Sequence, residues 1–213
     1  DPMPSGVVLW TRLAPKPLEG GGMPMAAVEV GWEVARQRSF SDVVQQGSAL
    51  ARPELGHSVH VEVNGLEPGR EYFYRFRAGR EVSQVGRTKT APADGAAVDR
   101  LRFAVCGCNH FETGHFTAFR RIAEEQFDFV FHTGDYIYEG RADGGRSSRV
   151  RQHNSDELYT LVDYRNRYAQ YKSDPDLMAA HASAPFVLTW DDHEVDNDYA
   201  GDSDENDTPP EVF

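Results

Sequence analysis

The sequence predicts a two-domain chain of the α+β class, with a β-sandwich in residues 1–97 and the first part of an α/β domain in residues 98–213. Two observations predict this division. In the first half, apolar and polar residues alternate with period two, which is typical of half-buried strands. In the second half, apolar strands alternate with longer helical patterns, which favours βαβ units and parallel pairing.

Four short alternating segments make up the predicted sandwich. They are Gly6–Thr11, Ala27–Val34, Val59–Val63 and Tyr72–Arg77. Turn residues separate them, as in β-sandwiches of about 90 residues. The run Leu66–Tyr72 resembles the tyrosine corner of fibronectin type III-like sandwiches, in which the Tyr hydroxyl bonds to upstream backbone. We therefore expect a fibronectin-like domain, with residues 91–97 as the linker that follows it.

The second half reads as three strands and three helices. The strands are expected at residues 101–107, 127–132 and 184–190, and the helices at 116–126, at 156–171 and from Asp174 onwards. Pro175 is favourable as the first residue of that last helix, because its missing N–H would have no partner there. Charged residues of the 156–171 helix, including Arg165 and Arg167, are expected on a solvated face.

Composition excludes several classes of protein. The chain carries 34 acidic and 22 basic residues, a net charge of −12, which argues against a general nucleic-acid binder. A membrane span is excluded because no run of about 18 apolar residues occurs. Cys106 and Cys108 are too close for a disulfide framework. The first residue is not Met and the last residues lie in an acidic loop, so we expect a fragment whose export signal would lie elsewhere.

Polar side chains follow each predicted strand of the second half. Cys108 follows the first, Asp135 and Tyr138 follow the second, and Asp191 to Asp198 follow the third. Ligands of open α/β sheets bind beyond the carboxyl ends of the strands. Taken singly, Cys108 could be a small buried side chain and Asp135 a turn residue. Adjacent carboxylates, however, repel each other unless a cation or hydrogen bonds offset the cost.

The donor types narrow the chemistry of this predicted site. Thiolate and imidazole favour transition metals, whereas carboxylate and amide oxygens suit calcium, magnesium or manganese. A mixture of both kinds suggests two unlike metals that share a carboxylate. Such a pair suits phosphoryl transfer, because one ion lowers the pKa of bound water and both hold phosphate oxygens.

Long stretches at these positions resemble PhoD-type alkaline phosphatases of the calcineurin-like metallophosphoesterase superfamily. They include Cys108-Asn109, Gly134–Glu139, Tyr171–Leu177 and Thr189–Val195. The resemblance implies a fibronectin-like domain ahead of a metallophosphoesterase domain. It further implies a secreted, periplasmic or cell-wall-associated hydrolase that uses Fe(III) and Ca(II). The expected substrates are phosphomonoesters and phosphodiesters, attacked by a metal-activated hydroxide at a site of two or more metals.

The resemblance also assigns roles to individual residues. It implies metal ligands at Cys108, Asp135, Tyr138, Asp192 and Asn197, and contact with the phosphate or the leaving group at His193. Asp135 would bridge the metals and Tyr138 would be the phenolate on iron. His110 is expected to be outside the ligand set, and His132 to be packed in the core. The superfamily's remaining ligands come from later strands, so the chain alone should bind metal weakly and turn over little.

Two other functions stay open at this point. A non-enzymatic module could use the sandwich for adhesion and the acidic half for structural calcium, but this leaves the thiol and the phenol unexplained. A nucleotide or phospholipid diesterase could have the same metal site. The expected partners are therefore a small phosphate ester or a phosphodiester polymer, together with the missing carboxyl-terminal part of the domain.

Overall fold

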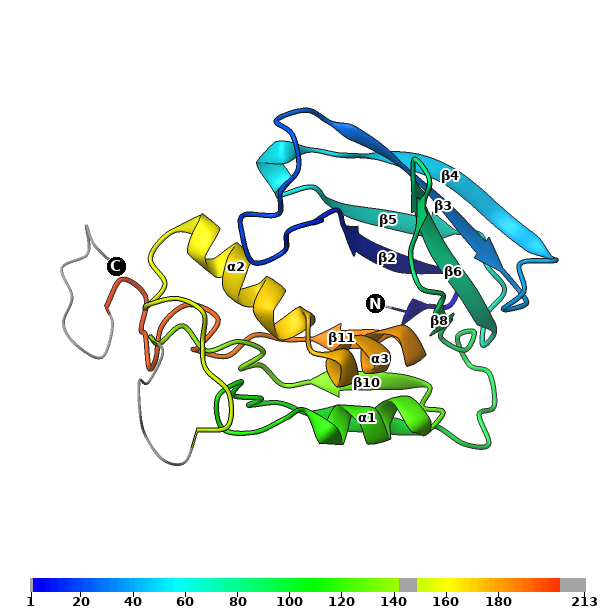
Figure 1. Cartoon of the computed structure of the whole chain (residues 1–213). Helices are drawn as coiled ribbons and strands as arrows, with labels where there is room; N and C mark the ends of the chain where they lie inside the picture. Colours follow the sequence, from blue (N-terminus) through cyan, green and yellow to red (C-terminus); the bar gives the residue numbers. More distant parts are fainter. Residues whose placement is uncertain (1, 142–148, 204–213) are drawn as a thin grey trace.

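The structure is a computed structural model, and it describes residues 2–141 and 149–203. Figure 1 shows two stacked parts, an all-β part formed by the first half of the chain and an α/β part formed by the second. The predicted fold class is confirmed. Among the described residues, no helix has both the length and the apolar character to cross a membrane.

Two antiparallel sheets pack face to face in the all-β part. One has the order β1-β2-β5 and the other β4-β3-β6-β7, with β8 also paired to β6. The strands are β1 Pro2–Met3, β2 Gly6–Arg12, β3 Val28–Ala35, β4 Val43–Ala51, β5 Ser58–Asn64, β6 Glu71–Ala78, β7 Glu81–Val82 and β8 Gly86–Lys89, and the short helix η1 spans Pro53–Leu55. In β5 the three valines are buried and the residues between them are exposed. That alternation places the shared core between the two sheets.

Strand β4 was not predicted, because its middle lacks apolar residues. Gln45, Gln46, Gly47 and Ser48 occupy the middle, and the strand pairs with β3 at the edge of its sheet. A Cβ on Gly47 would lie 2.6 Å from Cζ2 of Trp32, so this position accepts only glycine without movement of the indole. Backbone hydrogen bonds with β3 and the close contact with Trp32 define β4. Neither feature produces an alternation of apolar and polar residues in the sequence.

The predicted corner hydrogen bond is present. The backbone N–H of Glu67 donates to the Tyr72 hydroxyl at 2.9 Å, and Tyr72 is almost fully buried in the core between the sheets. The bond fixes the turn that leads into β6. Its neighbour Tyr74 packs edge-on against Phe76 at a centroid distance of 6.0 Å.

Three parallel strands form the sheet of the α/β part, in the order β11-β10-β9. They are β9 Phe103–Cys106, β10 Phe129–His132 and β11 Phe186–Leu188, and the helices are α1 Thr117–Glu124, α2 Leu161–Lys172 and α3 Pro175–Ser183. The buried core lies among these helices and the loop after β10, and it includes Phe119, Ile137, Tyr171 and Leu177. All predicted strands and helices exist, each somewhat shorter than expected.

Helix α2 begins five residues later than predicted. Thr160 caps it, because its hydroxyl accepts from the Asp163 N–H while the Asp163 carboxylate accepts from the Thr160 N–H. Leu161 and Val162, expected on the apolar face, are 64% and 53% exposed. The solvated face predicted for Arg167 is also wrong, because that side chain is completely buried.

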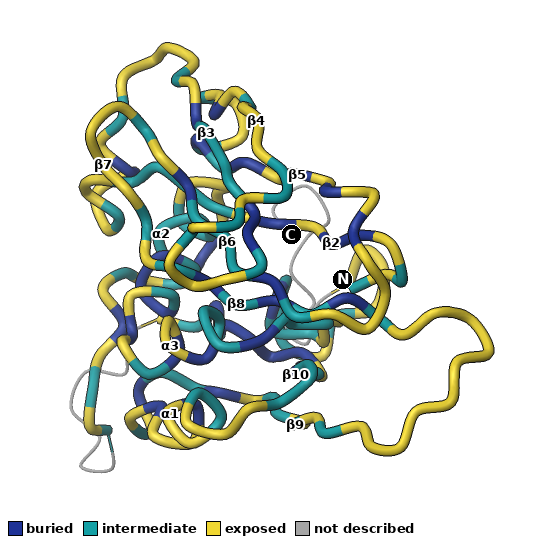
Figure 2. Tube along the Cα trace, turned by 90° about the vertical axis from the view of Figure 1, so that its right-hand side faces the viewer, coloured by how far each residue is buried: buried dark blue, intermediate teal, exposed yellow. Residues whose placement is uncertain are grey.

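The sandwich and the α/β part contact each other through polar bonds. Arg87 of β8 donates to the carbonyls of Phe127 at 2.9 Å and Ser183 at 2.8 Å. Lys89 forms an ion pair with Asp128. Residues 92–101, which connect the two parts, are all exposed, and Figure 2 shows them as a yellow loop before β9.

Lys172 at the end of α2 makes a second contact between the parts. Its Nζ lies 4.8 Å from the ring of Trp10 on β2 and 4.7 Å from the ring of Tyr136. It also donates to the Tyr136 hydroxyl at 3.2 Å. Burial lowers the pKa of Lys172 to about 8. Aromatic faces therefore stabilise a cation that desolvation opposes.

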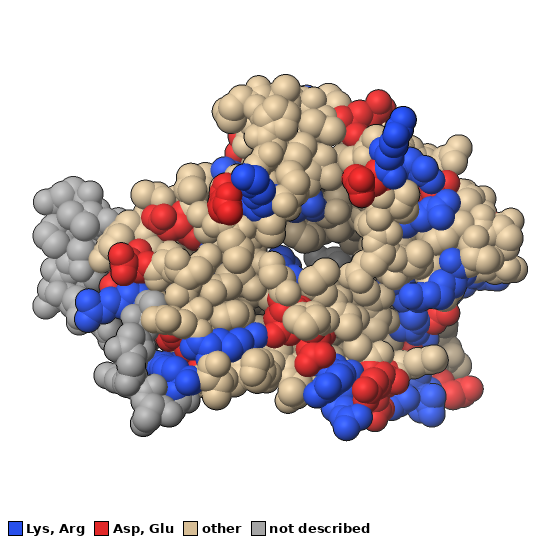
Figure 3. Space-filling model, in the orientation of Figure 1, with Lys and Arg blue, Asp and Glu red and all other residues tan. Residues whose placement is uncertain are grey.

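Charge is mixed on the surface. On the face shown in Figure 3, blue Lys and Arg side chains are interspersed with red Asp and Glu rather than gathered into one basic patch. Ion pairs such as Arg36–Glu67 and Arg102–Glu125 account for part of this mixing. Interspersed charge of this kind does not favour binding to a phosphate backbone.

Tyr72→Phe should lower the free energy of unfolding by about 1–2 kcal/mol, because it leaves the Glu67 N–H without its acceptor. Tyr74→Phe is the matched control, since no hydrogen bond of its hydroxyl occurs among the described residues, and it should change stability by less than about 0.5 kcal/mol. Urea unfolding of both variants measures the difference, and equal effects would contradict the corner assignment.

Lys172→Met should change how stability depends on pH. The folded pKa of Lys172 is about 8 against an ordinary 10.5, so the unfolded chain holds this proton more tightly between those values. Stability of the wild type relative to Lys172→Met should therefore rise between about pH 8 and pH 10.5. Denaturant unfolding at pH 7 and pH 9.5 measures this, with exposed Lys16→Met as control. A pH-independent difference would contradict the lowered pKa.

Candidate metal centre

The loops that follow the three parallel strands run side by side. Cys108 donates its N–H to the Gly134 carbonyl at 3.1 Å, and Asn109 donates to the Asp135 carbonyl at 3.2 Å. Beyond β11, the Thr189 N–H donates to the His132 carbonyl at 3.1 Å. The backbone pairing therefore extends past the strands and brings the three predicted motifs to one edge of the sheet.

Gly134 permits the closest approach between two of these loops. Its φ is +108°, and a Cβ at this position would lie 2.5 Å from the Asp191 nitrogen. Gly107 has a similar role, because a Cβ there would lie 2.2 Å from Oγ1 of Thr133. Side chains at either position would force the loops apart.

Cys108 and Asp135 both adopt left-handed backbone conformations. Their φ values are +53° and +51°, which are uncommon for residues with a side chain. Conformations of this kind cost about 1–3 kcal/mol and cluster at functional sites. They turn the thiol and the carboxylate out of their loops. Cys108 is exposed, so its thiol does not lie in the apolar interior.

Four of the predicted ligands and the predicted catalytic histidine converge. Asp135, Asp192 and His193 each offer a ligand atom, and these atoms lie within 4.8 Å of one another. The Tyr138 hydroxyl donates to Oδ2 of Asp135 at 2.9 Å. The Cys108 thiol interacts directly with the Asp135 carboxylate. Asp135 is thus the common neighbour of the predicted donors.

Oδ1 of Asp135 is buried and has no hydrogen-bond partner among the described residues. An unpaired carboxylate oxygen in a buried position is costly unless a cation lies beside it. The neighbouring thiol, phenol, imidazole and carboxylate are all common metal ligands. The residues present therefore fit a metal ion that would lie against this oxygen.

The pKa values of the thiol and the phenol of the site are raised. Interaction with Asp135, followed by burial, raises the pKa of Cys108. Burial, followed by the hydrogen bond to Asp135, raises the pKa of Tyr138 well above its usual range. A bound cation would lower both pKa values, because it stabilises the thiolate and the phenolate directly. The site as built is therefore electrostatically suited to a cation.

His193 is held by a neighbouring carboxylate. Its Nδ1 lies 2.8 Å from Oε2 of Glu139, and its ring lies 4.1 Å from the Tyr138 ring. Burial lowers the pKa of His193, but the hydrogen bond and charge of Glu139 outweigh it, so the net pKa is raised. With Nδ1 engaged, Nε2 is the ring atom left to meet a ligand.

Glu194 is a structural residue of the site that sequence reasoning missed. Its buried carboxylate accepts N–H bonds from Asp135 at 3.0 Å, from Asp191 at 2.7 Å and from Tyr136. It therefore joins the loop after β10 to the loop after β11. Glu139 was missed in the same way. In the sequence Glu194 looks like one more acidic residue of an acidic stretch and Glu139 like an ordinary polar residue after a strand, and only their hydrogen-bond partners distinguish them.

Asn197 lies beside the cluster. Its backbone N–H donates to Oε1 of Glu139 at 2.9 Å, and its side-chain amide lies 3.4 Å from Asp198. Asp198 in turn donates its N–H to Asp192 at 2.7 Å. Asn197 therefore lies near the centre, and its role as a ligand stays a prediction.

His132 is packed in the core, as predicted. His132 is completely buried and lies 2.6 Å from Oδ1 of Asn109, whose amide donates to the Tyr136 carbonyl. His110 lies beside the centre, with its ring 4.3 Å from that of Tyr138. Burial lowers the pKa of His110, which keeps it neutral.

Glu194→Gln should weaken the junction between the two loops. The substitution replaces one carboxylate oxygen by an N–H₂ group that faces backbone donors, which should cost about 2–4 kcal/mol. Exposed Glu62→Gln on β5 is the matched control and should be nearly neutral. Denaturant unfolding of both variants measures the effect. Equal stabilities would show that Glu194 does not hold the loops together.

Both halves of the chain match models of one protein family. The family model described as PhoD-like phosphatase matches residues 103–213, and the model of the N-terminal domain of PhoD-like phosphatases matches residues 1–92. Alkaline phosphatase D of Bacillus subtilis (strain 168) is 54% identical over 215 residues, which cover all of this chain and 37% of that protein.

A solved structure described as a structure of PhoD is 53% identical and superposes with a TM-score of 0.97. It covers 100% of this chain, whereas this chain covers 41% of it. The chain thus spans well under half the length of both relatives. Matches over both halves, at this level of identity, lead to one conclusion: the chain belongs to the PhoD-like phosphatase family.

Proposed function

We propose that the intact protein is a metal-dependent phosphoric ester hydrolase and that this chain supplies about half of its metal site. The observation that carries the proposal is the buried, unpaired Oδ1 of Asp135, in a carboxylate that Cys108 and Tyr138 contact and that lies within ligand distance of Asp192 and His193. Family membership supports the reaction class, because the Bacillus subtilis relative that is 54% identical is described as an alkaline phosphatase.

The donor set supports unlike metals. Cys108 and Tyr138 offer sulfur and phenol oxygen, which suit iron, while the carboxylates of Asp135 and Asp192 suit calcium. Fe(III) and Ca(II) are therefore the proposed ions, with Asn197 as a further oxygen donor for calcium. When bound, the ions would lower the pKa of water and hold the phosphate oxygens.

The protein's own groups have separable tasks in this proposal. Asp135 would be a ligand shared by both ions, and Asp192 would be a ligand of the second ion. Among the converging side chains, His193 has the imidazole, which can exchange a proton near neutral pH. Glu139 orients this ring through Nδ1. His193 is the proposed donor of a proton to the leaving oxygen or of a hydrogen bond to the phosphate.

Substrate range and compartment are proposals of the same kind. The proposed substrates are phosphomonoesters and phosphodiesters, which the same ligand set can serve. A nucleotide or phospholipid diesterase is the alternative, and a substrate panel on the intact protein distinguishes it. Secretion stays a prediction, since nothing among the described residues bears on the compartment.

Asp135→Asn in the intact protein should lower kcat/KM for an aryl phosphate by more than about 100-fold. Loss of a group that only orients a metal ligand lowers activity by about 10- to 100-fold, and loss of the shared ligand itself should lower it further. The assay is hydrolysis of p-nitrophenyl phosphate and of its bis ester with iron and calcium supplied, together with metal analysis. Exposed Asp202→Asn is the matched control and should retain full activity.

Two results would contradict the proposal. Unchanged turnover in Asp135→Asn would favour the non-enzymatic calcium-binding module. Robust turnover by residues 1–213 alone would show that the ligands outside this chain are dispensable, which is the opposite of what a half-built site requires.

A further inference from the structure

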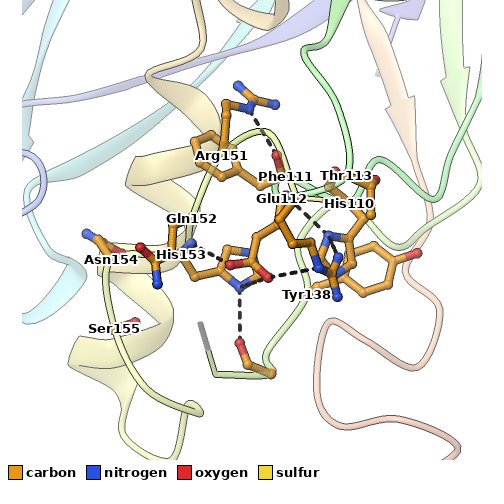
Figure 4. Close-up of polar contacts among 12 residues, drawn as sticks. His110, Phe111, Glu112, Thr113, Tyr138, Arg151, Gln152, His153, Asn154 and Ser155 are labelled. Carbon is orange, nitrogen blue, oxygen red and sulfur yellow. Dashed lines mark hydrogen bonds and ion pairs between the residues drawn. The ribbon is translucent and has the colours of Figure 1, made fainter. Parts of the chain in front are cut away.

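A cluster of buried polar side chains lies behind Tyr138, outside the donor set. Glu112, His153, Arg167 and Tyr171 are each 4% exposed or less. Figure 4 shows Glu112 and His153 joined by a hydrogen bond, with Tyr138 and His110 beside them. The cluster connects the loop after β9, the segment before α2, and α2 itself. The proposed chemistry uses none of these four residues.

Arg167 joins two loops through its guanidinium. Nη1 donates to the carbonyls of Tyr138 and of Gly140, the latter at 3.0 Å. Nη2 donates to Oγ of Ser155 at 3.0 Å and to the Asp156 carbonyl at 3.1 Å. The planar fork of arginine suits this geometry, because its donors point in fixed directions.

A buried guanidinium of this kind is a poor source of stability. Removal of a cation from water costs several kcal/mol, and packed apolar side chains of similar volume often replace buried charges without loss. Most of the partners of Arg167 are backbone carbonyls, with Glu112 and Glu139 contributing at longer range. Directional bonds to carbonyls fix the path of the chain more than they stabilise the fold.

The clamped carbonyls lie on either side of Glu139. Glu139 accepts the hydrogen bond of His193 Nδ1 at 2.8 Å, and the Tyr138 hydroxyl donates to Asp135 at 2.9 Å. One guanidinium therefore fixes the backbone from which both the proposed phenol ligand and the partner of the proposed proton donor extend.

Tyr171 supports the same segment from the opposite side. Its hydroxyl accepts the Phe111 N–H at 3.1 Å, lies 3.0 Å from Nε2 of His153, and interacts with the backbone of Tyr138. Nη1 of Arg167 also lies 3.1 Å from Nδ1 of His153. The four side chains form one continuous support behind the Tyr138 loop.

We propose that Arg167 is a positioning residue, which holds Tyr138 and Glu139 at the distances that the reaction needs without touching substrate or metal. The inference rests on the proposed function and assigns to the α2 helix a task within that site. Positioning within a fraction of an ångström affects the reaction more than it affects substrate binding.

The test compares Arg167→Lys with Arg165→Lys in the intact protein. Both changes keep the charge and lie on α2, but Arg165 donates to the Glu54 carbonyl of the sandwich, 2.7 Å away. The measurements are kcat and KM for p-nitrophenyl phosphate, the iron content, the visible absorption of the iron-loaded protein per bound iron, and the melting temperature.

In Arg167→Lys, kcat should fall at least tenfold with KM within threefold, because one ammonium cannot span both loops. If Tyr138 binds Fe(III) as proposed, the iron-loaded protein should show a visible tyrosinate-to-iron charge-transfer band. In Arg167→Lys this band should shift or lose half of its intensity at equal iron content. Arg165→Lys should keep kcat and the band. A folded Arg167→Lys protein with wild-type kcat and band would overturn the inference.

A second variant covers the case in which Arg167→Lys does not fold. Ser155→Ala removes one acceptor of the same guanidinium and leaves the charge in place. It should lower kcat about threefold with KM unchanged, and wild-type kcat in Ser155→Ala would then overturn the inference. If the wild-type intact protein hydrolyses neither ester, the proposed function is wrong. If the wild type is active and the Arg167 variants are equally active, the proposed function stands and only the positioning role of Arg167 is wrong.

Discussion

The candidate metal centre depends on one constraint, the close approach of the loops that follow β10 and β11. Gly134 allows that approach, since any Cβ there would meet the Asp191 nitrogen at 2.5 Å. Glu194 then fixes it, because a single carboxylate accepts N–H groups from both loops. A buried carboxylate bonded to several backbone donors is stable as an anion. Asp135 and Asp192 face each other only because this junction holds.

Groups that carry like charges lie close together in the same region. Asp135, Asp192 and the potential thiolate of Cys108 carry like charges at short range, and the pKa of Cys108 is raised by Asp135 first. Left-handed backbone at Cys108 and Asp135 adds strain. Both costs are borne by the fold in the absence of a cation. Binding of a cation would relieve the electrostatic cost, so ion binding and local stability should be coupled.

Sequence reasoning located the strands and the convergence of their ends, because apolar periodicity and strand-end motifs are local signals. It could not assign Glu194 or Glu139, whose roles depend on hydrogen-bond partners 54 to 59 residues away in the chain. An acidic residue that caps buried N–H groups looks the same in a sequence as a solvated one. Contacts of that kind are properties of the folded chain.

The two wrong predictions for α2, its start at residue 156 and the solvated face of Arg167, have a related cause. A helix start at residue 156 follows from the apolar pattern, but the segment before Thr160 is tethered to Arg167 instead of joining the helix. An arginine on a helix usually lies in solvent. Arg167 is buried because the segments at Tyr138 and Ser155 close over it. No pattern within α2 encodes those segments.

Helix α2 also explains why the sandwich and the site belong to one mechanical unit. Three residues on it reach in different directions: Arg165 to Glu54 of the sandwich, Arg167 to the Tyr138 loop, and Lys172 to Trp10 of β2. Lys172 also contacts Tyr136, which directly follows Asp135. Lys172 therefore links Trp10 of the sandwich to the residue that follows Asp135. Contacts that share a rigid element couple, whereas distant independent sites simply add. Loosening the sandwich at Trp10 should thus weaken the hold of α2 on the loop of Asp135, although Trp10 touches no residue of the proposed donor set.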